Sequence, residues 1–449
     1  GHEARKAFQT GDRKTSVGRF KREMGTNKKF DLENSEFSAT DLSAVVLKAL
    51  KKIAEKEVGD IASVVITVPA NFSHDARTAT MEAAKIAGLN VEVIIDEPTA
   101  AALYYAFKSG DNVSGNYAVY DLGGGTFDVS IIKIENGKNV EVLATNGLHK
   151  LGGDDFDNAL IKIVEKKFNE KFDLKFDSNK HYNLDQAEED KIVLSHVTKT
   201  QKAIEGEIFE ITRDEFEEEI SSLIAQTSML CESVLDEADL SPENLSGVFL
   251  AGGSTRIPAV LESVEKVFKI KPTQTENVDE IVALGASLYA AYMSDGEHLT
   301  AAQEASIKQL DVQDVTSDNF GTIVVRENVS KGQDESVNKI LIEKNTKRPC
   351  DFSDTFYTMF EGQERINCTV TQSKTKETDP TFVKVIWEGE LELPPNRPAG
   401  QEIIVTFSYD VNSVMHCQFE DKQTGKITEV NLDIASEENE SGIDKFLVD

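Results

Sequence analysis

A run of three glycines between two apolar segments is the feature of the sequence with the clearest chemical meaning. Asp121 ends the apolar segment 117–120, glycines occupy 123–125, and a second apolar segment covers 129–134. Glycine has no Cβ, so the backbone can approach a ligand closely and successive N–H groups can converge on an anion. A carboxylate beside a bound phosphate makes sense when a cation such as Mg²⁺ is held there too. The pattern predicts a phosphate-binding hairpin, with an ordinary glycine-rich turn as the alternative.

A second glycine turn follows another apolar segment much later in the chain. Residues 248–251 have the composition of a buried strand, and two glycines come directly after them. We expect Ser254 or Thr255 to cap a helix that has Pro258 in its first turn. A helix N-terminus that follows a strand and glycines is a natural phosphate site. Two such turns in one chain favour a nucleotide site over two unrelated turns.

The order and spacing of these motifs resemble the heat shock protein 70 (DnaK-type) chaperone family. The matching segments are 65–72, 87–91, 96–102, 121–128, 151–157 and 252–258. The resemblance extends from Gly1 to about Ile434. It implies an α/β actin-like ATPase domain followed by an all-β peptide-binding sandwich.

The resemblance also implies roles for four residues in ATP hydrolysis. Lys21 matches the family's catalytic lysine near the γ-phosphate, and Glu97 matches an acid near the Mg²⁺ and the attacking water. Asp121 matches the aspartate that holds Mg²⁺ through water, and Thr126 matches a hydroxyl close to the γ-phosphate. Without the match, Lys21 would be an ordinary surface lysine and Glu97 a helix-start carboxylate favoured by the helix dipole.

A larger set of residues matches the family's nucleotide-binding positions. The set comprises Gly123, Gly124, Gly125, Thr126, Gly152, Gly153, Glu188, Lys191, Ser195, Gly252, Gly253, Ser254, Arg256 and Asp279. Glu188, Lys191 and Ser195 match the helix that binds adenosine, although a solvated charged face would be the interpretation without the match. The implied ligands are ATP or ADP with Mg²⁺.

Composition and periodicity divide the chain into two domains. We expect a nucleotide-binding domain over 1–295, an interdomain linker over 296–315, a β-sandwich substrate-binding domain over 316–435 and an acidic tail over 436–449. Apolar periodicity in the first domain predicts strands at 64–68 and 91–95, helices at 75–87 and 99–107, and a helix-rich segment over 155–238. Short strands separated by Gly, Pro and Asn turns indicate the β domain.

For the second domain the resemblance implies a groove that holds an extended polypeptide by main-chain bonds and one apolar pocket. The peptide-binding candidates are Phe320, on the first strand of the groove, and four candidates for the pocket: Val325, Met359, Ile366 and Cys368. For Ile366 and Cys368, a place in the sandwich core is an equally good interpretation. Polar residues between Arg326 and Asn338 predict a longer loop at the rim of the pocket.

Charge, cysteines and hydropathy limit the partners. The formal net charge of −31 disfavours nucleic acid, and no apolar run approaches the roughly 18 residues that span a membrane. Four widely spaced cysteines without a CxxC motif indicate free thiols in a reducing, cytoplasmic compartment. The partners implied by the resemblance are unfolded or extended polypeptides, a J-domain co-chaperone and a nucleotide exchange factor.

The sequence also departs from the family pattern. Family members begin with a strand-turn-strand that carries another phosphate loop and have a helical lid over the peptide groove, and neither has a counterpart in these 449 residues. We expect weak Mg-ATP binding and slow or absent hydrolysis from a chain without that loop. An ATP-driven chaperone in truncated form is the first interpretation. A non-catalytic homologue that regulates another chaperone is the second, and the β domain argues against a sugar kinase.

Overall fold

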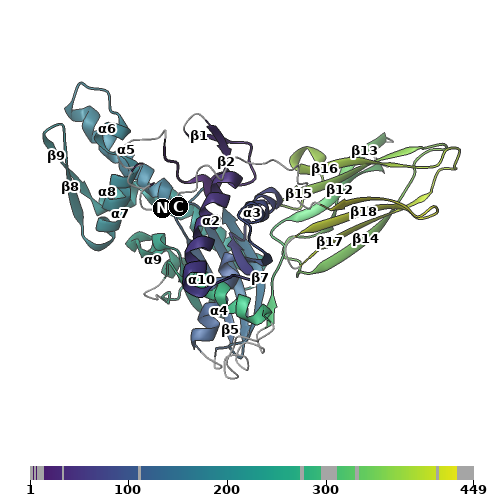
Figure 1. Ribbon diagram of the computed structural model, residues 1–449, viewed down its shortest axis with the longest axis horizontal. Coiled ribbons are helices and arrows are strands. Elements are labelled where there is room, and N and C mark those ends of the chain that lie inside the picture. Colours follow the sequence, from purple (N-terminus) through teal and green to yellow (C-terminus); the bar gives the residue numbers. More distant parts are fainter. Residues whose placement is uncertain are drawn as a thin grey trace. The chain divides into compact units, whose positions relative to one another are not determined.

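The computed structural model describes Ala4, Ala7 and residues 15–32, 35–109, 113–273, 278–294, 311–328, 333–410 and 414–431. These residues group into two compact units that divide between Val312 and Gln313 (Figure 1). The expected linker lies outside the described residues over 296–310, and so does the expected acidic tail over 436–449. Asp311–Gln313, which we expected to belong to the linker, forms strand β11.

A five-stranded sheet forms the centre of the first unit, in the order β10-β5-β6-β7-β11. Its strands are β5 (Gly115–Leu122), β6 (Phe127–Glu135), β7 (Asn139–Leu148), β10 (Leu245–Ala251) and β11. β5, β6 and β7 are antiparallel neighbours, and β10 is parallel to β5. β5 and β6 are largely apolar and mostly buried, as expected for strands covered on both faces of a sheet. The glycine run at 123–125 is the turn between β5 and β6.

The helices in this part of the unit pack on the sheet, on one another or on the smaller sheets. They are α4 (Glu97–Ser109), α5 (Gly153–Lys171), α6 (Ser178–His181), α7 (Leu184–His196), α8 (Arg213–Glu237), α9 (Pro258–Phe268) and α10 (Ile281–Met293), with short 3-10 turns η2 (Pro242–Asn244) and η3 (Gly253–Arg256). Helix α8 packs on β6 and β7, and α4 packs on β5, β6, β7 and β10. The core between the sheet and α5, α8 and α9 includes fully buried Phe156, Phe216 and Phe268. The sheet and its helices thus hold the β5–β6 turn in a rigid frame.

Smaller sheets complete the first unit. They are β1 (Lys29–Leu32) with β2 (Ser35–Ser38), β3 (Val64–Val68) with β4 (Val91–Asp96), and β8 (Lys199–Ile204) with β9 (Glu207–Thr212). Helices α2 (Ala39–Val58) and α3 (His74–Ile86) pack on each other, and the turn η1 (Phe20–Glu23) contacts α2. The β8–β9 hairpin lies inside the segment that we expected to be helical. Polar residues alternate with buried Ile204, Phe209 and Ile211 there, which is the period of a strand.

The second unit consists of two antiparallel four-stranded sheets, in the orders β13-β12-β15-β16 and β14-β17-β18-β19. Their strands are β12 (Asn319–Asn328), β13 (Gln333–Ile342), β14 (Cys350–Tyr357), β15 (Arg365–Ser373), β16 (Lys384–Glu392), β17 (Glu402–Tyr409), β18 (Met415–Asp421) and β19 (Lys426–Asn431), with a 3-10 turn η4 (Pro380–Phe382). One apolar core contains side chains from both sheets, including Val370 and Phe407.

The expected long loop between Arg326 and Asn338 is wrong for most of its length. β12 and β13 continue through it in antiparallel register, and Arg326 opposes Glu335. An ion pair of 2.8 Å between the Arg326 guanidinium and the Glu335 carboxylate supports the pairing. Polar side chains are tolerated because these ends of the strands are largely exposed, so polarity there does not signal a loop.

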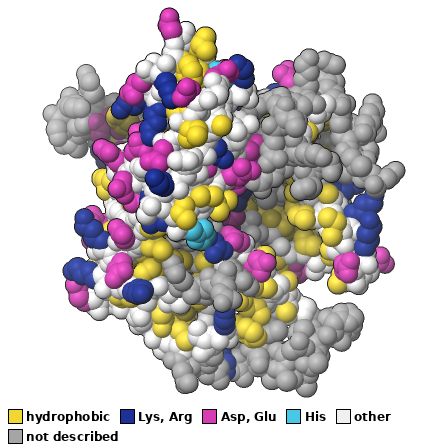
Figure 2. All heavy atoms as spheres, turned by 90° about the vertical axis from the view of Figure 1, so that its left-hand side faces the viewer, with side chains coloured by type: hydrophobic (Ala, Val, Ile, Leu, Met, Phe, Trp, Pro, Cys, Tyr) yellow, Lys and Arg dark blue, Asp and Glu magenta, His cyan; other side chains and the backbone are white. Residues whose placement is uncertain are grey.

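Charged side chains on the surface are mixed. Figure 2 shows acidic side chains interspersed with Lys, Arg and hydrophobic side chains on the face that it presents. On the part of this face that is drawn in colour, acidic side chains are therefore scattered and not gathered in one patch. None of the helices in the described part of the chain combines the length and the hydropathy that crossing a bilayer requires.

Candidate functional site

Three glycine turns from distant parts of the sequence meet at one place in the first unit. The Gly123 carbonyl accepts hydrogen bonds from the Gly153 N–H and from the Ser254 hydroxyl, both at 2.9 Å. The Gly124 carbonyl accepts one from the Asp154 N–H at 2.8 Å. The turns at 123–125, 152–153 and 252–254 thus form a single hydrogen-bonded structure, which brings the predicted glycines together.

The capping role expected for Ser254 or Thr255 is wrong. Both residues lie in η3, and α9 begins only at Pro258 with no side-chain cap. The Ser254 hydroxyl binds the Gly123 carbonyl, and the Thr255 hydroxyl binds the Gly252 carbonyl at 2.7 Å. These side chains connect and tighten the glycine turns, and Pro258 occupies the first turn of α9 as expected.

The glycines are required by close backbone packing. A Cβ at Gly252 would lie 2.4 Å from the Leu122 carbonyl oxygen, and one at Gly152 would lie 2.8 Å from the Gly124 carbonyl. Gly124 differs, because a Cβ there would meet no atom within 4 Å. Its Cα therefore faces open space, at the edge of a cavity.

This cavity has a volume of about 390 Å³, within the range of small-molecule sites. Its lining contains eight of the predicted nucleotide-binding residues: Gly124, Glu188, Lys191, Ser195, Gly253, Ser254, Arg256 and Asp279. The other predicted residues, Gly123, Gly125, Thr126, Gly152, Gly153 and Gly252, do not line it. Sequence reasoning missed Ile192, His196 and Ile257. Residues 188, 192 and 195 lie one helical turn apart, so the period of α7 could have revealed Ile192.

Ion pairs hold the polar side chains of the cavity in place. The Lys191 ammonium lies 2.8 Å from the Asp157 carboxylate and donates to the Gly153 carbonyl at 3.0 Å. Burial raises the pKa of Asp157 to about 6, although the Lys191 charge acts in the opposite direction. Across the cavity, the Arg256 guanidinium pairs with the Asp279 carboxylate at 2.7 Å. Two cationic groups, each paired with a carboxylate, therefore border the cavity, and Glu188 adds a negative charge to its lining.

Buried carboxylates lie near the β5–β6 turn. Asp121 and Asp128 are directly opposite each other on neighbouring antiparallel strands, where two like charges repel. Burial, and then the negative charge of Glu97, raises the pKa of Asp121 to about 7, while Lys21 lowers it. Burial raises the pKa of Asp128 well above its ordinary value, and Glu97 and Asp121 add to this. Such a group of carboxylates is stabilised by a nearby cation.

Lys21 supplies one cation for this group. Its ammonium donates to the Glu97 carboxylate at 2.7 Å, across 76 positions of the sequence. Burial alone would lower the pKa of Lys21, but the Glu97 carboxylate outweighs it and raises the pKa. Asp121 and Asp128 also act on Lys21 electrostatically, so three of the predicted catalytic residues share one field. The fourth, Thr126, is buried in the β5–β6 turn and its carbonyl accepts the Gly123 N–H at 3.2 Å.

A divalent cation fits this chemistry if water completes its shell. Nowhere in the described ranges are three or more His, Cys, Asp or Glu side chains arranged to ligate a metal together. Mg²⁺ usually keeps several of its waters and takes one or two protein carboxylates plus phosphate oxygens. Asp121 and its neighbours meet that weaker requirement, because a cation would stabilise carboxylates whose pKa values are raised first by burial and then by neighbouring negative charge.

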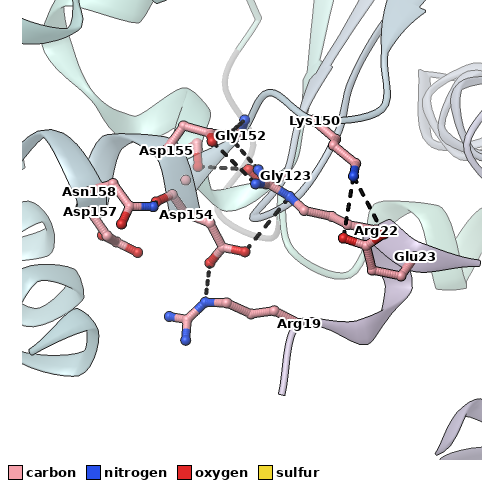
Figure 3. A network of polar contacts seen from close by, with 12 residues as sticks. Arg19, Arg22, Glu23, Gly123, Lys150, Gly152, Asp154, Asp155, Asp157 and Asn158 are labelled. Atoms are coloured by element: carbon pink, nitrogen blue, oxygen red, sulfur yellow. Dashed lines mark hydrogen bonds and ion pairs between the residues drawn. The ribbon is translucent and has the colours of Figure 1, made fainter. Parts of the chain in front are cut away.

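Arginines that the sequence reasoning missed fix η1 against the glycine turns (Figure 3). The Arg19 guanidinium binds Asp154 at 2.6 Å, and the Arg22 guanidinium binds Asp155 at 2.5 Å. Asp155 also accepts the Gly152 N–H at 2.9 Å. The basic segment that carries Lys21 is thereby tied to the N-terminus of α5, where carboxylates are favoured.

The second unit has a cavity of about 560 Å³ with apolar and polar lining. Val325, Met359 and Ile366 line it, as predicted for the peptide pocket. Phe320 and Cys368 do not, because they are 1% and 0% exposed in the core. Cys368 shares a strand face with Ile366 but lies deeper under the facing sheet. Phe320 packs on the Tyr409 ring, with ring centroids 5.4 Å apart.

Comparisons with known proteins agree with the motifs. The family model described as Hsp70 protein matches residues 9–449. A relative described as chaperone protein DnaK, from Mycoplasma mobile, is 34% identical over an alignment that covers 97% of this chain and 71% of the relative.

Proposed function

The chain belongs to the Hsp70 family and is an Hsp70-like molecular chaperone, and on this premise we propose that its 390 Å³ cavity binds ATP or ADP with Mg²⁺. The observation that supports this most directly is the joining of three glycine turns at the edge of that cavity. Backbone amides at the turns suit the phosphates. Glu188, Lys191 and Ser195 on α7 suit the adenosine, with Arg256 and Asp279 opposite them.

We further propose that the first unit has the actin-like fold and hydrolyses ATP. The Lys21 ammonium would stabilise the negative charge that develops as the γ-phosphate leaves, and Glu97 positions it through their 2.7 Å hydrogen bond. Asp121 would hold a water of the Mg²⁺ shell, and the Thr126 hydroxyl would contact the γ-phosphate. Mg²⁺, when bound, would neutralise phosphate charge. The low-dielectric surroundings of Asp121 strengthen each of these interactions.

For the second unit we propose a β-sandwich that binds unfolded or extended polypeptide in the 560 Å³ cavity. Val325 and Met359 are about half exposed there, and Ile366 is half-buried and packs against the core of the sandwich. Exposed apolar side chains at the mouth of a cavity are typical of a binding site for an apolar residue. Nucleotide turnover in the first unit would regulate this binding, with a J-domain co-chaperone and a nucleotide exchange factor as partners.

We place the protein in the cytoplasm in this proposal. Cys231, Cys368 and Cys417 are buried free thiols and Cys350 is a half-buried one. Burial raises the pKa of the Cys368 thiol to about 12, so it is protonated and unreactive. Such cysteines suit a reducing compartment.

A pair of lysine substitutions tests the catalytic assignment. In a version of the chain to which the family's first phosphate loop has been restored, Lys21→Ala should lower the single-turnover rate of ATP hydrolysis by about 100-fold while changing ADP affinity by less than about threefold, because Lys21 acts on charge that develops in the transition state. Lys28→Ala is the matched control, since Lys28 belongs to the same segment but pairs with Glu23 at 3.1 Å. Calorimetry with Mg-ADP and rapid-quench hydrolysis give the two readouts. Equal rates for both variants would refute the role of Lys21, and undetectable Mg-ADP binding by the unmodified chain would refute the site.

A further inference from the structure

A large cavity lies outside both proposed sites. It has a volume of about 790 Å³ and runs between α8 and α9 in the first unit. The hydroxyls of Ser228 and Ser263 meet at 2.8 Å and mark a close approach of the two helices. The cavity shares no residue with the 390 Å³ cavity or with the Lys21 site. The 790 Å³ cavity is therefore not part of the proposed nucleotide site, and a ligand other than the nucleotide would occupy it.

The cavity is an elongated groove. Its lining on α8 extends from Glu217 to Asp236, about 28 Å along the axis at 1.5 Å per residue. Its lining on α9 and just beyond extends from Ala259 to Lys269, about 15 Å. A small molecule covers only part of such a length, whereas a helix of three to five turns covers it along one side. Helix-in-groove docking is a recurring mode of recognition between proteins.

The floor of the groove is apolar and its walls are mainly acidic. Ile224 and Leu235 belong to the core of the unit and reach the floor, where Ala225 is exposed. Four acidic side chains, Glu217, Glu232, Asp236 and Glu262, line the walls together with Lys266 and Lys269. One of the two lysines is already paired, because the Lys269 ammonium lies 2.8 Å from the Glu243 carboxylate.

Negative charge is poorly compensated at the end of the groove formed by Glu217 and Glu262. Burial, with a contribution from Glu262, raises the pKa of Glu217, although Arg213 acts in the opposite direction. One Glu217 oxygen accepts a hydrogen bond from the Ala259 N–H, and Oε1 is buried without a hydrogen-bond partner in the described structure. A cationic side chain placed here would gain a partner and relieve the repulsion between the two carboxylates.

We propose that the groove between α8 and α9 is a docking site for a basic amphipathic helix of a partner protein. The helix would place apolar side chains at i, i+3/i+4 and i+7 on the floor formed by Ile224, Ala225 and Leu235. Its Lys or Arg side chains would lie against Glu217, Glu262 and Glu232. The acidic walls select basic over acidic helices.

The test uses the full chain and a fluorescent helical peptide of about 16 residues with leucines on one face and lysines flanking them. An excess of an unlabelled leucine-rich heptapeptide is present throughout, so that the cavity of the second unit is filled. We expect saturable binding by fluorescence polarisation, weakened about tenfold or more by Ala225→Trp, which fills the floor from an exposed position. Ser222→Trp adds the same ring to exposed α8 surface outside the groove, and it should leave binding unchanged.

Charge variants separate electrostatics from apolar burial. Glu262→Gln should weaken binding of the lysine peptide about threefold, whereas Glu219→Gln, on α8 but outside the lining, should not. Replacing the lysines of the peptide by glutamates should abolish binding, and raising the salt concentration should weaken it. Equal binding by the two peptides, or binding that Ala225→Trp and Ser222→Trp affect equally, would overturn the proposal. Circular dichroism confirms that each variant is folded.

Discussion

Two glycine substitutions should separate stability from ligand binding. Gly252→Ala should lower the stability of the protein, and Gly124→Ala should weaken ligand binding. Gly252 has φ +81° and ψ 142°, a region that residues with a Cβ rarely adopt, so Gly252→Ala costs about 1–3 kcal/mol in backbone strain alone. The added Cβ would also lie 2.4 Å from the Leu122 oxygen and 2.8 Å from the Gly123 nitrogen, both backbone atoms that cannot rotate away. Forcing such contacts apart typically costs a further 1–3 kcal/mol.

The total of about 2–6 kcal/mol is a large part of the stability of a typical domain. We expect the melting temperature of Gly252→Ala to fall by roughly 4–24 °C, taking about 2–4 °C per kcal/mol for a unit of this size. Gly124→Ala is the matched control, because its Cβ would meet nothing within 4 Å. It should melt within about 1 °C of the unmodified protein.

Ligand binding should be weakened in the Gly124→Ala variant, which keeps its stability. The Gly124 methyl group would point to the edge of the 390 Å³ cavity, so Gly124→Ala should weaken Mg-ADP binding while leaving the fold intact. Differential scanning calorimetry gives the melting temperatures, and titration calorimetry gives the affinities. A Gly252→Ala protein that melts within 1 °C of the unmodified chain would refute the argument from backbone contact.

Three further predictions concern charge, the apolar cavity and the second unit. Burial and Glu97 raise the pKa of Asp121 to about 7, so the ligand-free protein loses stability from this group as the pH rises from about 4 to 7. Asp121→Asn should therefore increase the free energy of unfolding in urea more at pH 8 than at pH 5. An equal change at both pH values would contradict this. Ile366→Asp should have the circular dichroism spectrum of the unmodified protein and bind the heptapeptide about tenfold or more weakly. Cys368→Asp should instead unfold the second unit, because it buries a charge in the core. A folded Cys368→Asp protein would contradict the burial argument. A fragment covering 313–431 should melt in one cooperative transition, since its two sheets share one core, and the absence of a transition would show that it needs the rest of the chain.

Sequence reasoning succeeded where a local pattern determines local structure. The strand predicted at 64–68 has those bounds in the structure, and the helix predicted at 75–87 spans His74–Ile86. Apolar runs and caps encode these elements within a few residues, so no distant contact is needed to infer them. The glycine turn at 123–125 belongs to the same class, because a strand on each side confines it.

The errors occurred where distant contacts decide the outcome. The Ser254 hydroxyl has a choice between a helix N–H and a carbonyl 131 positions away, and only the fold shows that the Gly123 carbonyl takes it. Cys368 and Ile366 have the same parity along β15, so the sequence cannot tell which lies under the facing sheet. Arg19 and Arg22 were ordinary charges in a basic segment until the fold placed Asp154 and Asp155 beside them.

The attachment of η1 has a consequence for the order in which the protein assembles. Lys21 and its neighbours Arg19 and Arg22 bind partners 76 to 135 positions away, almost entirely through ion pairs at the edge of the unit. Closing such long loops costs entropy that only a preformed partner surface can offset, so this segment should join after the five-stranded sheet has formed. Concentrated salt screens ion pairs far more than it weakens an apolar core. A salt titration should therefore free the side chains of Lys21, Arg19 and Arg22 while Phe20 and Met24 keep η1 on the apolar core, so that a folded molecule exists with its reactive ammonium no longer held in position.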